Sequence, residues 1–229
     1  MSTSPEEPAQ TAVSTGIDAA PLLEGVDLEC ARDERLLFSG LSFVLRPGQI
    51  LQIEGANGSG KTSLLRILCG LTLATEGEVR WMGQDIHEVR ADYYADLAYI
   101  GHAHGVKDDL TPVENLRIAT ALGNAKPDAL SDEALEEALL AVGLFGFEDQ
   151  LAQTLSAGQR RRVALARLLL TRARLWILDE PLTALDRAGH EKIETMLTEH
   201  AQGGGMVIFT SHHALNLHSD VVTTLHIGT

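Results

Sequence analysis

The sequence contains few cysteines and few basic residues. Its two cysteines, Cys30 and Cys69, form no CxxC pair, and the first residues show no basic region followed by an apolar stretch and a cleavage site. These absences favour a protein of the reducing cytoplasm. Lysine and arginine together number 18 against 32 acidic residues, which gives a formal net charge of −14. This balance argues against a protein that binds nucleic acid through a broad basic face.

Long apolar runs are also missing. The most apolar region, 163–178, is interrupted by Arg167, Arg172 and Arg174. A membrane-spanning helix needs about 20 consecutive apolar residues, so we expect the chain not to cross a bilayer. Any association with a membrane would then depend on a partner.

The chain is nevertheless long and apolar enough to fold into a globule, with 229 residues of which 45% are hydrophobic. Residues 1–20 are rich in Ser, Thr, Pro and Ala without a helical or strand period, and we expect a disordered tail there. Residues 21–229 alternate between strand and helix patterns, which predicts an α/β fold with a mostly parallel sheet. The expected strands are 22–30, 41–45, 49–54, 78–82, 97–100, 175–178 and 206–210, and the expected helices are 62–69, 132–142, 157–170 and 187–202. The first two strands are expected to pair with each other, and a helical segment is expected as an insert at about 102–160.

A glycine-rich loop follows the strand predicted at 49–54. The run Gly55-Ala56-Asn57-Gly58-Ser59-Gly60-Lys61-Thr62 fits GxxxxGK[ST] and leads into a predicted helix, with Ser63 next along the chain. Glycines allow successive backbone N–H groups to converge on phosphate oxygens at a helix N-terminus. Lys61 would then reach the outer phosphates, and Thr62 would offer its hydroxyl to Mg²⁺. The alternative is a glycine turn with an exposed lysine.

Two adjacent carboxylates, Asp179 and Glu180, end the apolar strand predicted at 175–178. Side chains alternate along a strand, so the two carboxylates can take different tasks. We expect Asp179 to hold Mg²⁺ and Glu180 to align and deprotonate the attacking water. An Asp-Glu pair alone is often only a turn or a helix cap, but together with a phosphate-binding loop it favours a nucleotide hydrolase.

The run Leu155-Ser156-Ala157-Gly158-Gln159 resembles the LSGGQ signature of the ATP-binding cassette (ABC) family, and the resemblance extends over most of the chain. It implies a P-loop nucleotide-binding domain with an antiparallel β subdomain and a helical insert, and it implies ATP and Mg²⁺. It also implies a head-to-tail homodimer, in which Ser156 and the Gly158 backbone contact the γ-phosphate held by the other copy. Ser156 could instead be only a helix N-cap.

Further positions match the family in order. The run 183–186 looks like the D-loop, in which Asp186 communicates between the two sites, and His212 looks like the switch residue that contacts the γ-phosphate. His213 is the competing neighbour. His102 stands where the family usually has a glutamine that links the metal site to the helical insert. Arg32 lies near the position of the usual adenine-stacking aromatic residue, and a guanidinium plane can also stack on a base.

One branch of the family is especially similar: the ATPase subunit of the cytochrome c maturation system, a heme exporter. The similarity lies in 29–35, 37–43, 99–102, 155–167 and 175–181. It implies a peripheral protein on the cytoplasmic face of a bacterial inner membrane, with integral membrane partners, whose ATP hydrolysis drives heme export or heme release from its chaperone. The sequence has no CxxCH heme attachment site. We do not expect direct heme binding, even by the His102 and His104 pair.

Three alternatives remain: the ATPase of another ABC exporter, an ABC protein that serves translation or DNA repair, and a nucleotide-binding regulator without hydrolysis. The second class usually carries two cassettes, a coiled-coil insertion or a basic arm, and the third would not need Glu180. The charge pattern adds a hypothesis about partners. The segment 102–150 holds ten acidic and three basic residues, and we expect it to face basic loops of a membrane partner.

Overall fold

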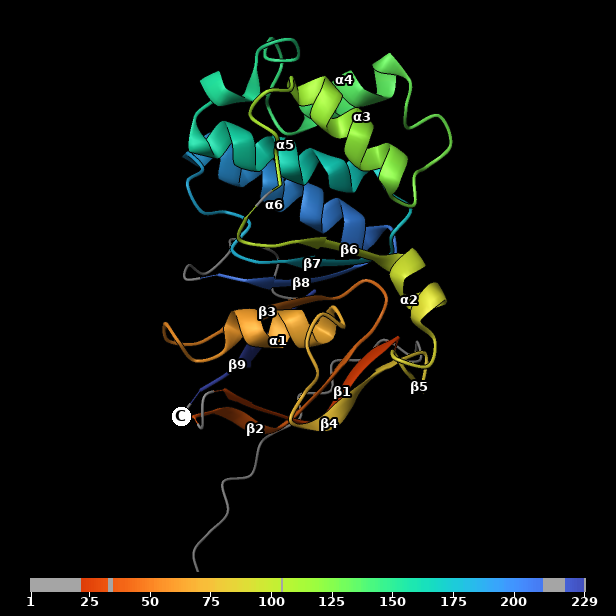
Figure 1. Cartoon of the computed structure of the whole chain (residues 1–229), viewed down its shortest axis with the longest axis vertical. Coiled ribbons are helices and arrows are strands. Elements are labelled where there is room, and N and C mark those ends of the chain that lie inside the picture. The colour runs from red at the N-terminus through yellow and green to blue at the C-terminus, as the bar shows by residue number, and fades with distance from the viewer. Residues whose placement is uncertain (1–21, 33–34, 104, 212–220, 229) are drawn as a thin grey trace, which may run out of the picture.

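The computed structural model describes residues 22–32, 35–103, 105–211 and 221–228. The disordered tail expected at 1–20 lies outside the described residues, as do His104, His212 and His213. The predicted α/β architecture is confirmed, with two sheets and two groups of helices (Figure 1).

The central sheet has five strands in the order β6-β7-β8-β3-β9, and every neighbouring pair is parallel. All residues of β7 and β8 are buried, because helices or a second sheet cover both faces of a parallel sheet. The strands are β3 (Ile50–Glu54), β6 (Leu97–Ile100), β7 (Leu175–Leu178), β8 (Met206–Thr210) and β9 (Val222–His226).

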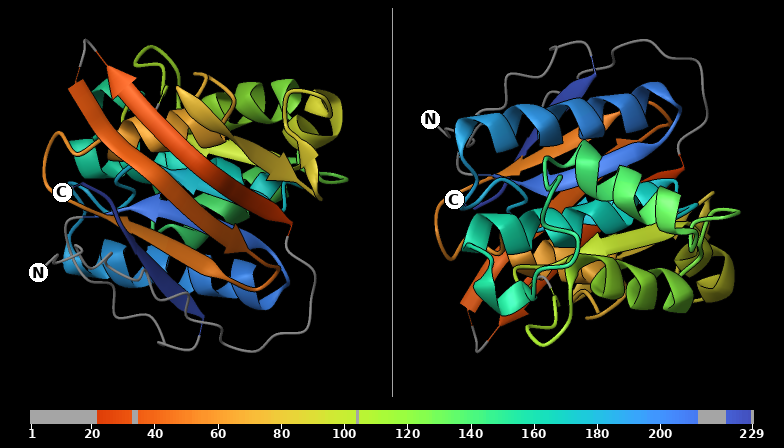
Figure 2. Two further views of the ribbon diagram at one scale, coloured as in Figure 1. Left: turned by 90° about the horizontal axis from the view of Figure 1, so that it is seen from below. Right: turned by 90° about the horizontal axis from the view of Figure 1, so that it is seen from above.

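A second, antiparallel sheet has the order β2-β1-β4-β5. Helix α1 (Lys61–Leu68) lies between the two sheets (Figure 1), and its buried leucines share one hydrophobic cluster with residues of both. Figure 2 shows the strands of this antiparallel sheet crossing the lower side of the molecule. The strands are β1 (Leu23–Arg32), β2 (Arg35–Leu45), β4 (Glu76–Trp81) and β5 (Gln84–Asp85).

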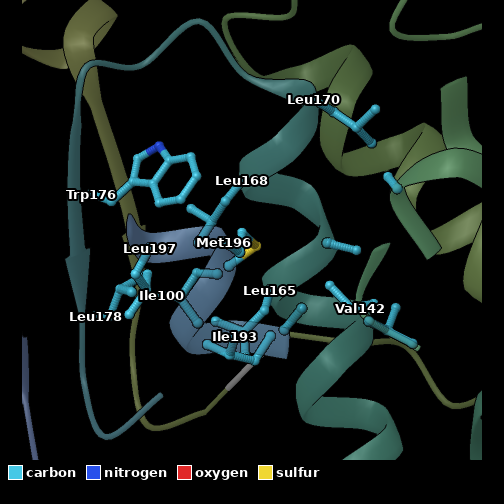
Figure 3. Packing of buried hydrophobic residues seen from close by; sticks show 14 of the residues in the cluster. Ile100, Val142, Leu165, Leu168, Leu170, Trp176, Leu178, Ile193, Met196 and Leu197 are labelled. Atoms are coloured by element: carbon cyan, nitrogen blue, oxygen red, sulfur yellow. The ribbon is translucent and has the colours of Figure 1, made fainter. Parts of the chain in front are cut away.

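The remaining helices cover the opposite side of the central sheet, apart from α2, which precedes β6 (Figures 1 and 2). Figure 3 shows Leu165 and Leu168 of α5 packed with Ile193 and Leu197 of α6 near Leu178 of β7. Side-chain caps mark the N-termini of several helices. At α3, for example, Thr111 and Glu114 form a capping box. The elements are α2 (Arg90–Asp96), α3 (Pro112–Leu122), α4 (Asp132–Ala141), η1 (Ala152–Thr154), α5 (Ala157–Leu170) and α6 (Arg187–Gln202).

Some elements differ from the sequence predictions. Strand β2 begins at Arg35, earlier than the expected 41–45. Its burial pattern is irregular and Gly40 has a positive φ, so the first half of the strand lacks the alternation by which a strand is recognised. No sequence pattern indicated α2, in which Tyr93 is the one buried residue, or β9, whose residues are half-buried or exposed. The helices α5 and α6 have the predicted bounds.

A stacked pair of rings joins α6 to the central sheet. The imidazole of His200 lies 3.6 Å from the ring of Trp176 with an interplanar angle of 6°. Its Nε2 atom lies 3.1 Å from the carbonyl oxygen of Arg174. Burial is the main cause that lowers the pKa of His200 to about 4.

This environment predicts a stability loss in mild acid. The unfolded chain takes up the His200 proton near pH 6.5 and the folded chain only near pH 4, so the contribution of a neutral His200 falls through this window. Allowing for partial solvent exposure, we expect the free energy of unfolding of the wild type to fall by about 1 kcal/mol more than that of His200→Phe between pH 7 and pH 5. Urea unfolding of both proteins at the two pH values measures this, and equal losses would contradict it.

Candidate active site

Four neighbouring strands of the central sheet end at one edge and bring distant parts of the sequence together. Because β6, β7, β8 and β3 are parallel neighbours, the loops after them leave the sheet on the same side. These loops begin with Gly101, Asp179, Ser211 and Gly55 respectively. The motifs predicted to act together therefore start from adjacent positions.

The glycine-rich loop joins β3 to α1 as predicted. Gly60, the residue before α1, has a φ of 102°, and no side chain caps this helix end. The first N–H groups of α1 are therefore free to meet an anion. Lys61 is only 7% exposed. Its Nζ atom donates to the carbonyl oxygens of Gly55 at 2.7 Å and Ala56 at 3.1 Å, so the loop curls around the ammonium group.

Thr62 and Asp179 meet beside this loop. The Thr62 hydroxyl donates to Oδ2 of Asp179 at 3.1 Å, and the Thr210 hydroxyl donates to Oδ1 at 2.9 Å. The Asp179 side chain is buried and thus fixed by two hydroxyls from different elements. A hydroxyl and a carboxylate side by side are the hard oxygen ligands that Mg²⁺ prefers, so this pair could hold the ion.

Glu180 has an unusual backbone conformation, with a φ of 50°. Its backbone N–H donates to the Thr210 hydroxyl at 2.9 Å, and its Oε2 atom accepts from the Thr183 hydroxyl at 3.1 Å. The residue is half-buried and lines a pocket of about 240 Å³ together with Ser211 and His190. A carboxylate held at the wall of such a pocket can orient a water molecule.

The signature-like run starts α5. Ser156 caps the helix, accepting from the Gln159 N–H at 3.2 Å, while Gln159 accepts from the Ser156 N–H at 2.8 Å. Leu155 is buried, and Ser156 and Ala157 are exposed. Ser156 therefore has the helix-capping role that its position in the sequence also allows.

Gly158 places the signature-like run against the 183–186 segment. A Cβ atom at Gly158 would collide with the carbonyl oxygen of Ala184. Ala184 itself has a φ of 66°. Asp186 accepts from the Gly189 N–H at 2.8 Å and thereby caps α6. The two motifs are in direct contact within one chain.

A pocket of about 340 Å³ opens beside the glycine-rich loop. Arg32 is exposed at the end of β1 and does not line this pocket, whereas Arg35, its partner in the β1–β2 register, does. His102 is exposed after β6. The pocket lining consists of Arg35, Leu36, Leu37, Gly55, Ala56, Asn57, Gly58, Ser59, His226, Ile227 and Gly228.

Sequence reasoning missed two residues of this site, Thr210 and Arg161. Thr210 is the fully buried last residue of β8, and its hydroxyl contacts both Asp179 and Glu180. A polar residue at the end of an apolar strand was the available signal. Arg161 stands in a run of three arginines, where the pattern gave no reason to expect a buried side chain.

These features together define an ATP-binding cassette: a phosphate-binding loop between strand and helix, an acidic pair after a buried parallel strand, an antiparallel sheet and a signature-like helix start. The family model described as ABC transporter matches residues 38–183. The chain belongs to the ABC transporter family, and it is an ATP-binding, ATP-hydrolysing member of that family.

Curated relatives named cytochrome c biogenesis ATP-binding export protein CcmA are similar over almost their whole length. The protein of Methylococcus capsulatus is 54% identical over 204 residues, which cover 89% of this chain and 96% of the relative. The protein of Nitrosomonas europaea is 50% identical over 215 residues, covering 94% of this chain and 99% of the relative. The protein of Shigella flexneri is 52% identical over 196 residues, covering 86% of this chain and 91% of the relative.

Solved structures agree with the fold. An ABC transporter ATP-binding protein from Pyrococcus furiosus superposes with a TM-score of 0.77 at 26% identity, covering 89% of this chain and 96% of that one. An ATP-binding subunit of another ABC transporter gives a TM-score of 0.71 at 25% identity. Within the described residues, every helix is too short or too polar to span a bilayer.

Proposed function

We propose that this chain is the ATP-hydrolysing subunit of an exporter for cytochrome c biogenesis, and that it couples ATP hydrolysis to the export of heme or its release from a chaperone. The observation that carries the proposal is the 54% identity, over 96% of its length, to a relative named for that process. The site supports it, since the phosphate-binding loop and both carboxylates are in place. In this proposal the chain itself does not bind heme.

In the proposed reaction, water attacks the γ-phosphorus of ATP and ADP leaves. The loop from Gly55 to Ser63 and the N-terminus of α1 bind the phosphates, and Lys61 exchanges its carbonyl contacts for phosphate oxygens. Thr62 and Asp179 would hold Mg²⁺, which neutralises charge on the phosphates when bound. Glu180 orients the water and takes its proton. We assign the γ-phosphate contact to His212, which lies outside the described residues.

We further propose that two copies form a head-to-tail homodimer. Ser156 is exposed at the N-terminus of α5, which favours an anion, and Gly158 follows it in the first, buried part of the helix. In the dimer this end would close on the γ-phosphate of the other copy, and Asp186 would lie between the sites. Arg32 would contact the adenine from the end of β1, beside its register partner Arg35, which lines the pocket next to the loop.

A groove of about 330 Å³ offers a docking place for a membrane subunit. It lies between β6, the end of α3 and α5, and Tyr99 and Arg167 line it. Two large side chains that line it are exposed, Leu122 at 85% and Tyr94 at 44%. Because β6 leads directly to His102, a partner in this groove would contact the segment that leaves the active site. We propose integral membrane partners and a peripheral position on the cytoplasmic face of a bacterial inner membrane.

The test is affinity purification of the tagged chain from membranes, identification of the integral proteins that accompany it, and ATPase assays with and without them. Cytochrome c assembly proteins should co-purify and change the rate of hydrolysis. A permease for another solute would reassign the chain to a different ABC exporter. Recovery with soluble translation or repair factors alone would reject the exporter function.

The charge of the 102–150 segment leads to a prediction for the same complex. If acidic residues such as Glu133 and Glu136 on α4 attract basic loops of the partner, assembly should weaken as salt rises. We expect several-fold less co-purification at 0.5 M than at 0.1 M NaCl, because the Debye length is then about half as long. Recovery that does not change with salt would contradict the electrostatic contribution.

A further inference from the structure

One arginine of the described residues lies buried at the active-site edge without an assigned role. Arg161 is only 4% exposed, and it belongs to the second turn of α5, the helix that starts with the signature-like run. Burial lowers the pKa of its guanidinium group, while Asp179 and Glu180 act in the opposite direction. Burial of a cation costs free energy unless its N–H groups are hydrogen-bonded, so the partners of Arg161 indicate what this residue does.

Arg161 donates to two backbone carbonyls at the ends of neighbouring strands. Its Nη1 atom lies 2.9 Å from the oxygen of Gly101, directly after β6, and its Nη2 atom donates to the oxygen of Asp179, directly after β7. Its Nε atom has no hydrogen-bond partner among the described residues. The planar guanidinium thus spans two strand ends, which a single ammonium group cannot do with the same geometry.

The second of these contacts fixes the peptide unit that joins the two carboxylate residues. The Asp179 carbonyl accepts from Arg161, and the N–H of Glu180, on the same peptide, donates to the Thr210 hydroxyl at 2.9 Å. Both polar groups of this peptide are therefore held by side chains from α5 and β8. The following residue, Glu180, has the positive φ of 50° that a residue with a side chain rarely adopts. The two hydrogen bonds hold it in that conformation.

We infer that Arg161 is a positioning residue for ATP hydrolysis: it fixes the Asp179–Glu180 peptide and so directs the Glu180 carboxylate, and through Gly101 it ties this peptide to the segment that begins at His102. The inference rests on the proposed role of Glu180. Both hydrogen bonds of Arg161 go to backbone carbonyls, those of Gly101 and Asp179, and neither goes to the glycine-rich loop. Its loss should therefore change the rate of the chemical step and leave ATP binding to the glycine-rich loop unchanged.

The test compares Arg161→Met and Arg161→Lys with wild type for kcat, KM, ATP affinity and melting temperature. Arg161→Met keeps an unbranched side chain in place of the apolar stem and removes both hydrogen bonds, so kcat should fall on the order of 10- to 100-fold. ATP affinity should stay within about twofold. Arg161→Lys can satisfy one carbonyl only, and its kcat should lie between those of wild type and Arg161→Met.

Arg117→Met is the matched control. Arg117 also donates from a helix to a backbone carbonyl, that of Leu130 at 3.1 Å, but it lies on α3 away from the strand ends. This variant should keep the wild-type kcat. If Arg161→Met does not fold, Arg161→Lys decides the question. A folded variant at position 161 with wild-type kcat, or one whose loss lies entirely in ATP affinity, would overturn the inference.

Glu180→Gln separates this inference from the assignment on which it rests. If Glu180→Gln hydrolyses ATP at the wild-type rate, the role of Glu180 is wrong, and the inference fails with it. If Glu180→Gln is inactive and folded Arg161→Met is as fast as wild type, only the positioning role of Arg161 is rejected.

Discussion

Replacement of Glu180 by glutamine is expected to abolish ATP turnover while ATP still binds. Glutamine keeps the size of the side chain but cannot take a proton from water, and loss of a general base typically lowers a rate by about 10²- to 10⁴-fold. The hydrogen bonds that hold Lys61, Thr62 and Asp179 do not involve the Glu180 side chain, so the phosphate-binding part of the site remains. Phosphate-release assays and equilibrium ATP binding measure the two effects separately.

The same variant should accumulate as an ATP-bound dimer, because hydrolysis no longer separates the two copies. Size-exclusion chromatography with Mg²⁺ and ATP, compared with ADP, detects this species. Glu191→Gln is a suitable control, since Glu191 is an exposed residue of α6 whose carboxylate pairs with Arg187 at 3.1 Å. Turnover of Glu180→Gln at the wild-type rate would refute the assignment of the base.

Replacement of Lys61 by alanine is expected to weaken nucleotide binding itself. The ammonium group is the one charged side chain of the glycine-rich loop, and hydrogen bonds from a cation to phosphate are among the strong ones. Loss of this contact should reduce ATP affinity by about 10- to 100-fold, with a parallel loss of hydrolysis. Titration calorimetry or a fluorescent ATP analogue measures the change.

Lys192→Ala, on the exposed side of α6, removes an equal charge away from the loop and should bind ATP like wild type. Unchanged affinity in Lys61→Ala would mean that the loop from Gly55 to Thr62 does not bind the phosphates. The two large predictions are thus complementary: one variant binds without turnover, and the other loses turnover because it binds poorly.

The short motifs of this site could be predicted from the sequence alone. The glycine-rich loop and the acidic pair were recognisable because their residue types and their place after apolar strands are themselves the requirement. The strand ends then meet because parallel strands share an edge. The core helices α5 and α6 were found from their apolar periodicity.

The parts that depend on tertiary contact were not predictable in this way. The run of three arginines at 160–162 gave no sign of burial, yet Arg161 turns inward because the carbonyls of Gly101 and Asp179 lie there. Strand β9 pairs with β3 across a long stretch of sequence. Arg35 lines the pocket beside the loop and Arg32 does not. This difference depends on the register of the β1–β2 hairpin, which contains irregularities that the local sequence does not reveal.

The contacts of Lys61 have a consequence for the choice of ligand. Its ammonium group is already satisfied by the carbonyls of Gly55 and Ala56, so an incoming anion must replace these contacts before it gains from the charge. A chain of phosphates reaches the helix end and the ammonium group together. A triphosphate can contact several backbone N–H groups of the loop as well as the ammonium group, so it replaces the lost carbonyl contacts with more bonds than a single small anion makes.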